Sequence, residues 1–155
     1  MFIKIDLKNA FNTLRRDSIL EAVAKHFLEL LHFAAFTIDS PFAFQYCKFI
    51  LHSEEGEQQG DTLGPLYFCL VFKEPLESMH SEHVLTYLDD VAFGDTTSIV
   101  LTDFINLEAT ASLLSLETKR SKCEVVGHTC ESRSLFEAHG VSLHETIGNT
   151  LDKAP

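Results

Sequence analysis

Two adjacent carboxylates, Asp89 and Asp90, are the residues of this chain whose types and spacing most directly suggest chemistry. They lie in the run VLTYLDDVAFG, residues 84–94, where apolar and β-branched residues flank them on both sides. This pattern predicts a β-hairpin with the two aspartates at its tip. Adjacent carboxylates repel one another unless a positive charge lies beside them, and Mg²⁺ prefers hard oxygen ligands of this kind. The alternative is a solvated acidic turn, since Asp is common in turns.

Three other segments accompany the aspartate pair. Asp6 closes a predicted strand over 2–6 and begins the sequence DLKNAF. The glycine-bearing run QQGDTLGPL, residues 58–66, opens a predicted central helix, and LETKRSKC, residues 116–123, precedes a predicted strand over 124–126. A strand end and a hairpin tip can meet at one edge of a sheet, so we expect Asp6 to lie beside the aspartate pair.

The elements that must position these residues alternate between strand and helix patterns. A second hairpin is predicted over 44–51. Apolar residues at helical spacing predict four helices, over 18–27, 29–38, 62–80 and 98–114. Ser18 and Glu21 predict a capping box at the start of the first, and Pro75 should kink or end the third. Residues 127–155 carry a weaker pattern. This order predicts an α+β fold in which a small antiparallel sheet packs against helices.

Composition limits the function classes that fit. The chain has 155 residues, 45% of them hydrophobic and 23% charged, which predicts a single globular domain over 1–155. A formal net charge of −11 argues against a stand-alone nucleic-acid-binding protein, because phosphate contacts need Lys and Arg. No apolar run is long enough to span a membrane, and the start MFIKID lacks the features of a secretion signal. We therefore expect an intracellular protein, in the cytoplasm or nucleus, that does not associate with membranes.

Cysteine spacing gives little support for a metal or disulfide framework. The four cysteines form no CxxC pair, so reduced thiols are expected. Cys123, His128, Cys130 and His139 could be written as a zinc set, but their spacing matches no zinc finger, and chance proximity is favoured.

Taken together, the four segments resemble motifs A, B, C and D of the reverse transcriptase palm, in particular that of non-LTR (LINE-like) retrotransposons. The resemblance covers residues 2–126 most strongly and implies a partial polymerase palm whose fingers and thumb are missing. It implies an RNA-directed DNA polymerase that uses two Mg²⁺ (or Mn²⁺) ions, with an RNA template, a DNA primer and dNTP as partners in the intact enzyme. The isolated fragment is expected to be inactive or very weak, and to bind nucleic acid weakly because it is acidic.

The resemblance also assigns roles to single residues near the reaction centre. Asp6, Asp89 and Asp90 correspond to the carboxylates that hold the two metal ions, and the backbone carbonyl of Leu7 completes the coordination of the nucleotide-bound ion. Lys122 corresponds to the motif D lysine that can protonate departing pyrophosphate. A lone surface lysine is the alternative for Lys122.

Substrate contacts follow from the same resemblance. Phe11 matches the aromatic residue that packs under the incoming sugar and excludes a 2′-hydroxyl, although a core aromatic at a helix start is the alternative. Gln59 and Gly60 match the glutamine-glycine pair of motif B. The absence of a Cβ at this glycine lets the backbone approach the nucleotide and template. Tyr87 is expected to pack beside the metal site and to touch the primer end.

Several positions depart from the family pattern. Thr62 stands where proline is expected in motif B, and Ser115 and Lys119 stand where motif D commonly has glycine and asparagine. These departures keep open a non-catalytic retroelement remnant that acts as a metal-binding or protein-interaction module. An RNA-directed RNA polymerase is disfavoured by Tyr87 and Phe11, and a chance coincidence by four motifs in order.

Overall fold

Two compact units make up the part of the chain that the structure describes. The structure, a computed structural model, describes residues 1–38, 42–53, 55–57, 61–127 and 130–141. Unit 1 comprises residues 1–8, 75–112 and the described residues from 117 onward, and unit 2 comprises the described residues of 9–74 and residues 113–116.

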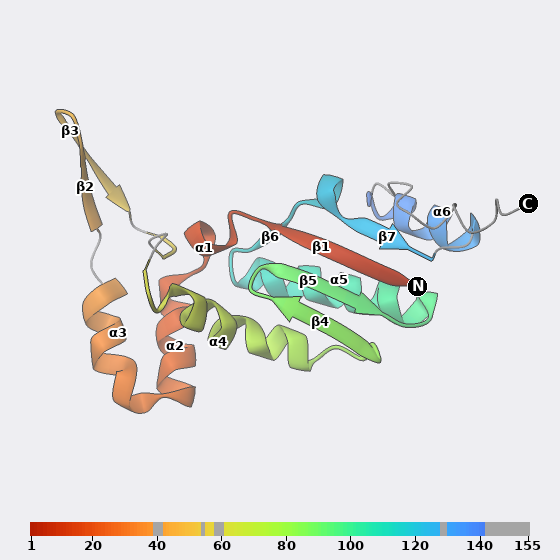
Figure 1. The fold of residues 1–155 in the computed structure, drawn as a ribbon, viewed down its shortest axis with the longest axis horizontal. Helices are drawn as coiled ribbons and strands as arrows, with labels where there is room; N and C mark the ends of the chain where they lie inside the picture. The colour runs from red at the N-terminus through yellow and green to blue at the C-terminus, as the bar shows by residue number, and fades with distance from the viewer. Residues whose placement is uncertain (39–41, 54, 58–60, 128–129, 142–155) are drawn as a thin grey trace, which may run out of the picture. The chain divides into compact units, whose positions relative to one another are not determined.

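Unit 1 is built on an antiparallel sheet of five strands (Figure 1). Its strands are β1 (Phe2–Lys8), β4 (His83–Tyr87), β5 (Asp90–Gly94), β6 (Glu117–Thr118) and β7 (Glu124–Val126). The order is β4-β5-β1, and both β6 and β7 pair with the remaining edge of β1. The first strand of the chain is therefore central in the sheet.

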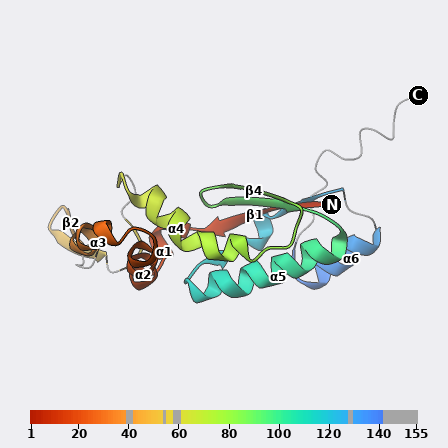
Figure 2. The same cartoon turned by 90° about the horizontal axis from the view of Figure 1, so that it is seen from below.

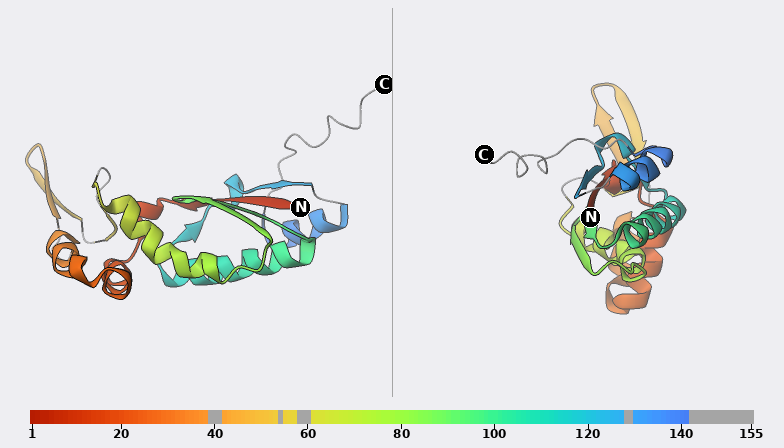
Figure 3. Two further views of the ribbon diagram at one scale, coloured as in Figure 1. Left: turned by 60° about the horizontal axis from the view of Figure 1, so that its bottom comes forward. Right: turned by 90° about the vertical axis from the view of Figure 1, so that its right-hand side faces the viewer.

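Alternation along β1 separates the core from an open face. Ile3, Ile5 and Leu7 are buried, with at most 4% of each exposed, whereas the intervening residues lie on the other face. Helices α5 (Thr97–Leu113) and α6 (Cys130–Ala138) cover the buried face (Figures 2 and 3). Phe104 of α5 and Phe136 of α6 are fully buried there, with ring centroids 6.2 Å apart. Helices on one side of an antiparallel sheet confirm the predicted α+β class.

A buried carboxylate of α5 fixes the turn that leads into β4. The side chain of Asp103 is 1% exposed. It accepts hydrogen bonds from the backbone amides of His80 (3.0 Å) and Ser81 (2.7 Å) and from the Ser81 hydroxyl (2.6 Å). Burial alone would raise the pKa of Asp103, but these hydrogen bonds outweigh it and hold the pKa below its usual value. Asp103 thereby anchors the start of the hairpin that carries the aspartate pair.

Unit 2 is helical with one hairpin. Its elements are α1 (Ala10–Thr13), α2 (Arg16–His26), η1 (Leu28–Leu30), α3 (Leu31–Ile38), β2 (Phe42–Tyr46), β3 (Phe49–Ser53) and most of α4 (Gly64–Glu77). Phe68 and Phe72 of α4 are buried, with ring centroids 5.4 Å apart. Ile19 and Val23 of α2 are also fully buried. The predicted helices over 18–27 and 29–38 and the hairpin over 44–51 are confirmed.

Gly56 makes a backbone approach that no other residue could make. Its φ is +65°, and a Cβ at this position would lie 2.2 Å from the carbonyl oxygen of Asn12. Its amide donates to the Leu14 carbonyl (3.1 Å), and its own carbonyl accepts from the Arg16 guanidinium (3.0 Å). The segment that precedes α4 is therefore held against α1 and α2.

Some predicted boundaries need correction. The capping box of Ser18 and Glu21 is wrong: α2 already begins at Arg16, so Ser18 lies inside it, and Arg15 is the N-cap residue without a side-chain cap. Helix α4 runs through Pro75 and ends at Glu77, two residues later, so the proline lies in its last turn. Helices α1 and α6 and the two-residue strand β6 were not predicted.

The remaining sequence expectations concern thiols and membranes. Cys47, Cys69 and Cys123 are free cysteines. His128 of the possible zinc set lies outside the described residues. Among the helices that the structure describes, none has the length and apolar character needed to cross a membrane.

Candidate active site

The register of the sheet brings two predicted carboxylates together. Asp6 of β1 lies directly opposite Asp90 of β5. Facing residues of an antiparallel pair point to the same face, with Cα atoms about 4.5–5.5 Å apart. Because Ile5 and Leu7 point into the core, Asp6 and Asp90 both point to the open face of the sheet.

The third carboxylate lies in the turn between β4 and β5. Tyr87 pairs with Asp90, which leaves Leu88 and Asp89 as a two-residue turn. Leu88 has φ +55°, a left-handed conformation that costs a bulky residue about 1 kcal/mol. The prediction placed both aspartates at the tip of the hairpin. In the structure Asp89 lies in the turn, and Asp90 is the first residue of β5. Residues held in such sparsely populated conformations are concentrated at functional sites.

Each paired carboxylate is accompanied by a lysine. The ammonium of Lys4 lies 3.2 Å from Asp90 Oδ1, and that of Lys122 lies 3.7 Å from Asp6 Oδ2. The hydrogen bond to Asp90 raises the pKa of Lys4. Two positive charges therefore oppose the mutual repulsion of the carboxylates.

Backbone pairing explains why Lys122 reaches Asp6. Strand β6 pairs with the end of β1, with Leu7 opposite Thr118. The amide of Lys119 then donates to the carbonyl of Asp6 (2.8 Å), and the one-turn 3₁₀ helix η2 (Arg120–Lys122) follows directly. The motif D segment is thus attached to the motif A strand by its backbone.

Tyr87 and Leu7 flank the carboxylates in different ways. Tyr87 is the last residue of β4 and is 77% exposed, so its ring is open to a ligand at the same end of the sheet. Leu7 is 4% exposed and its side chain belongs to the core, so only its backbone is available to a site beside Asp6.

Of the predicted substrate residues, Phe11 belongs to unit 2. Phe11 lies in α1 and contacts Phe68, with ring centroids 4.9 Å apart. This contact gives Phe11 a packing role within unit 2. Gln59 and Gly60 lie outside the described residues.

Glu57 lies two residues before Gln59 in the sequence. It is buried, and it was not predicted as a site residue. It is 6% exposed, and within the described part of the chain neither carboxylate oxygen has a hydrogen-bond partner. Burial, with a smaller contribution from the charge of Asp61, raises the pKa of Glu57 to about 8. A Cβ added at Gly64 would lie 2.6 Å from Glu57 Oε2, so the absence of a side chain at Gly64 makes room for this carboxyl.

The aspartates of unit 1 meet one of the two requirements of a divalent-ion site, the right ligand atoms, but not a converged geometry. Three aspartates at one end of the sheet supply the oxygen ligands that Mg²⁺ and Mn²⁺ prefer, and the register places two of them face to face. Among the described residues, however, no group of three or more Asp, Glu, His or Cys side chains already converges on one point. The ligand atoms suit a divalent ion. In this structure, however, the Asp6 and Asp90 carboxylates contact the ammonium groups of Lys122 and Lys4.

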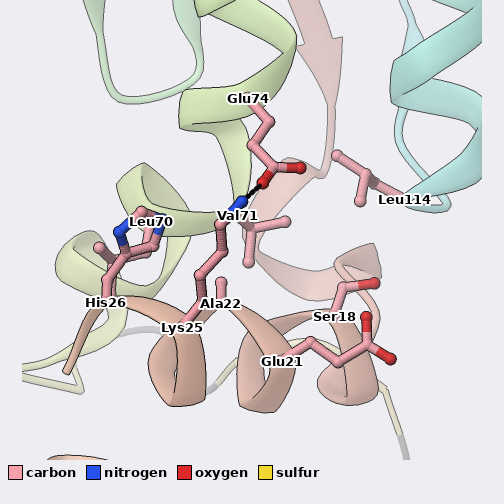
Figure 4. Close-up of a pocket in the computed structure, with 9 residues that line it drawn as sticks. All are labelled: Ser18, Glu21, Ala22, Lys25, His26, Leu70, Val71, Glu74 and Leu114. Atoms are coloured by element: carbon pink, nitrogen blue, oxygen red, sulfur yellow. Dashed lines mark hydrogen bonds and ion pairs between the residues drawn. The ribbon is translucent and has the colours of Figure 1, made fainter. Parts of the chain in front are cut away.

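A separate pocket of about 190 Å³ lies within unit 2 (Figure 4). An ion pair between Lys25 of α2 and Glu74 of α4 crosses it, and Leu70 and Val71 supply apolar walls. The other lining residues are Ser18, Glu21, Ala22, His26 and Leu114. None of the predicted site residues lines this pocket.

Comparison with protein families shows the family to which the chain belongs. A family model described as reverse transcriptase (RNA-dependent DNA polymerase) matches residues 1–136, which include all four motif segments. The chain belongs to the reverse transcriptase family. No curated protein matches this reverse transcriptase chain.

Two solved structures share the reverse transcriptase fold. Apo telomerase from Candida tropicalis, truncated from its C-terminal domain, is 17% identical with a TM-score of 0.61, and the match covers 79% of this chain and 29% of that one. Telomerase from Candida tropicalis in complex with a TWJ fragment of telomeric RNA is 16% identical with a TM-score of 0.53, covering 79% and 25%. The chain thus spans less than a third of the length of these relatives, and at this identity the likeness concerns the fold alone.

Proposed function

We propose that this chain is the palm of an RNA-directed DNA polymerase of the non-LTR retrotransposon type, which adds dNTP to a primer 3′-hydroxyl on an RNA template. The observation that carries the proposal is the facing pair Asp6 and Asp90, with Asp89 in the adjoining turn. Four motif segments in order support the retrotransposon subtype.

Asp6, Asp89 and Asp90 would hold two Mg²⁺ or Mn²⁺ ions. Such ions, when bound, lower the pKa of the attacking hydroxyl and neutralise charge on the triphosphate. Lys122, whose ammonium lies 3.7 Å from Asp6 Oδ2, would donate a proton to departing pyrophosphate. Tyr87, exposed at the end of β4, offers its ring to the primer end.

The remaining contacts are proposed from motif positions. The backbone carbonyl of Leu7 would complete the coordination of the nucleotide-bound ion. Phe11 would exclude a 2′-hydroxyl, and the Gln59–Gly60 step would approach the nucleotide and template. Because the chain spans 29% of the telomerase chain that it matches, polymerisation is proposed for the complete enzyme. The experiment on this chain therefore measures metal binding and not polymerisation.

The second candidate is a non-catalytic remnant that acts as a metal-binding or protein-interaction module. Two observations weigh against a preformed catalytic metal site and so keep this candidate open: Lys4 and Lys122 already neutralise the facing carboxylates, and no three-ligand group converges among the described residues. A folded chain in which Mn²⁺ binding did not depend on the three aspartates would support this candidate.

The test is Mn²⁺ binding, read from the loss of the free-ion EPR signal. We expect the wild-type chain to bind Mn²⁺ and Asp6→Asn, Asp89→Asn and Asp90→Asn each to weaken binding about tenfold or more. Glu124→Gln is the matched control, because it removes a carboxylate from β7 of the same sheet, and it should stay within about twofold of wild type. Equal binding by all variants would contradict the proposed site, provided that circular dichroism shows them folded.

A further inference from the structure

Lys4 is placed by the sheet to reach a catalytic carboxylate. It lies two residues before Asp6 on β1, so both side chains point to the open face. The residue opposite Lys4 on β5 is Ala92, whose small side chain leaves the path to Asp90 open along that strand. The residue opposite on β7 is Glu124, yet the Lys4 ammonium contacts Asp90, at 3.2 Å.

Two lysines offset two of the three aspartate charges at this end of the sheet. Asp6, Asp89 and Asp90 carry three negative charges, and Lys4 and Lys122 supply two positive charges, one against each facing carboxylate. Without the lysines, carboxylates on adjacent strands would repel one another and move apart. The lysines therefore supply in the metal-free chain the kind of charge that divalent ions supply in the proposed enzyme.

We propose that Lys4 is an internal counter-ion that holds the Asp90 carboxylate until a divalent cation displaces it. Lys4 is thus a positioning residue, and the proposal rests on the metal site of the proposed function. Its ammonium and the cation compete for the same oxygen. The pair is half exposed, with side-chain exposures of 51% and 53%, so displacement is not costly. The long flexible stem of lysine allows the ammonium to leave without a change in the backbone.

The competition makes an unusual prediction: removal of a positive charge by Lys4→Met should tighten Mn²⁺ binding. An exposed ion pair of this kind corresponds to about a two- to fivefold gain in affinity. Lys8→Met is the matched control, because Lys8 lies two residues beyond Asp6 on the same strand face and pairs with Glu117 (3.0 Å) rather than with an aspartate of the site. Lys8→Met should change the affinity by less than about twofold.

Two further variants separate competition from a general charge effect. In an Asp90→Asn background, Lys4→Met should no longer tighten Mn²⁺ binding, because the carboxylate for which the two cations compete is gone. Lys4→Arg keeps the charge and should bind within about twofold of wild type. If Lys4→Met fails to fold, Lys4→Gln removes the same charge with a polar side chain, and it should tighten Mn²⁺ binding by about two- to fivefold in the same way.

The outcomes distinguish this proposal from the metal site itself. Mn²⁺ binding that tightens in Lys4→Met and not in Lys8→Met supports the counter-ion. Binding that appears only after Lys4→Met, and not in wild type, supports it more strongly. Equal or weaker binding by Lys4→Met, with binding by wild type intact, overturns the counter-ion and leaves the metal site standing. No binding by any variant overturns both.

Discussion

Two buried carboxyl groups, one in each unit, have opposite surroundings. Asp103 of unit 1 accepts hydrogen bonds from two backbone amides and a hydroxyl, and its pKa is lowered. Glu57 of unit 2 has no hydrogen-bond partner within the described residues, and its pKa is raised to about 8. Burial acts in the same direction on both groups, so hydrogen bonding decides which form is stable. Asp103 fixes a turn as an anion, whereas Glu57 is held as a neutral acid at physiological pH.

The largest expected effect comes from removal of the satisfied carboxylate. Asp103→Ala should lower the free energy of unfolding by about 3–4 kcal/mol, because the buried amide and hydroxyl of Ser81 lose a charged acceptor, as does the amide of His80. Urea denaturation at pH 7 measures this loss. The folded pKa lies below the ordinary value of 3.8, so the contribution is present above about pH 4 and is lost as pH falls through the folded pKa. Wild type and variant should therefore converge at low pH, and a constant difference would contradict this account.

The unsatisfied carboxyl should have the opposite pH dependence. The folded pKa of Glu57 is about 8 against an ordinary value of 4.5. Between these values the unfolded chain ionises while the folded chain keeps its proton, so stability falls as pH rises from about 5 to 8 and then levels off. Glu57→Gln should flatten this slope and stabilise the chain at pH 8 by on the order of 2 kcal/mol. Thermal melts at pH 5 and pH 8 give the measurement, and an unchanged slope in the variant would show that Glu57 has a partner.

Gly64 tests whether the space around the Glu57 carboxyl depends on the absence of a neighbouring side chain. A Cβ at this position would lie 2.6 Å from Glu57 Oε2, which is the end of a flexible side chain. Gly64→Ala should cost about 1 kcal/mol in wild type and less in the Glu57→Ala background, where the conflicting oxygen is absent. A double-mutant cycle on unfolding free energies measures this coupling. Additive effects would mean that the space at Gly64 serves something other than the Glu57 carboxyl.

An exposed carboxylate provides the smallest expected effect. Glu74 pairs with Lys25 at the surface, and this hydrogen bond lowers its pKa. With 61% of the Glu74 side chain exposed, solvent screens the pair. Glu74→Gln should change the free energy of unfolding by less than about 0.5 kcal/mol in urea denaturation. A loss of unfolding free energy as large as that for Asp103→Ala would mean that burial does not explain the difference between Asp103 and Glu74.

Much of the fold could be predicted from the sequence, because the longest elements carry a clear apolar period. The strand over 124–126 matches the prediction, β1 begins where predicted and extends to Lys8, and α5 differs from its predicted range by one residue at each end. Helix α6 was missed because it has one fully buried large residue, Phe136, so its apolar stripe is too short to detect. Strand β6 has two residues, and only its pairing with β1 defines it.

Part of the candidate site could also be predicted from the sequence, and part could not. Positions at a strand end and a hairpin tip predicted that Asp6 would lie beside the aspartate pair, and in the register of β1 and β5 Asp6 faces Asp90. Lys4 was not predicted as a partner, because its contact depends on which residue lies opposite on the neighbouring strand. Glu57 stands in a polar loop and reads as exposed, and only the three-dimensional structure shows that it is buried.

Strand β1 joins two demands in one alternating pattern: odd-numbered residues fill the core and even-numbered residues carry Lys4 and Asp6. An insertion or deletion of one residue inside it would turn Asp6 into the core and bring an isoleucine to the surface. Substitution of single side chains has no such consequence. The length of this strand is therefore a stricter requirement of the fold than the identity of most of its residues, and loss of one residue here should disturb the core and the proposed site more than most single substitutions do.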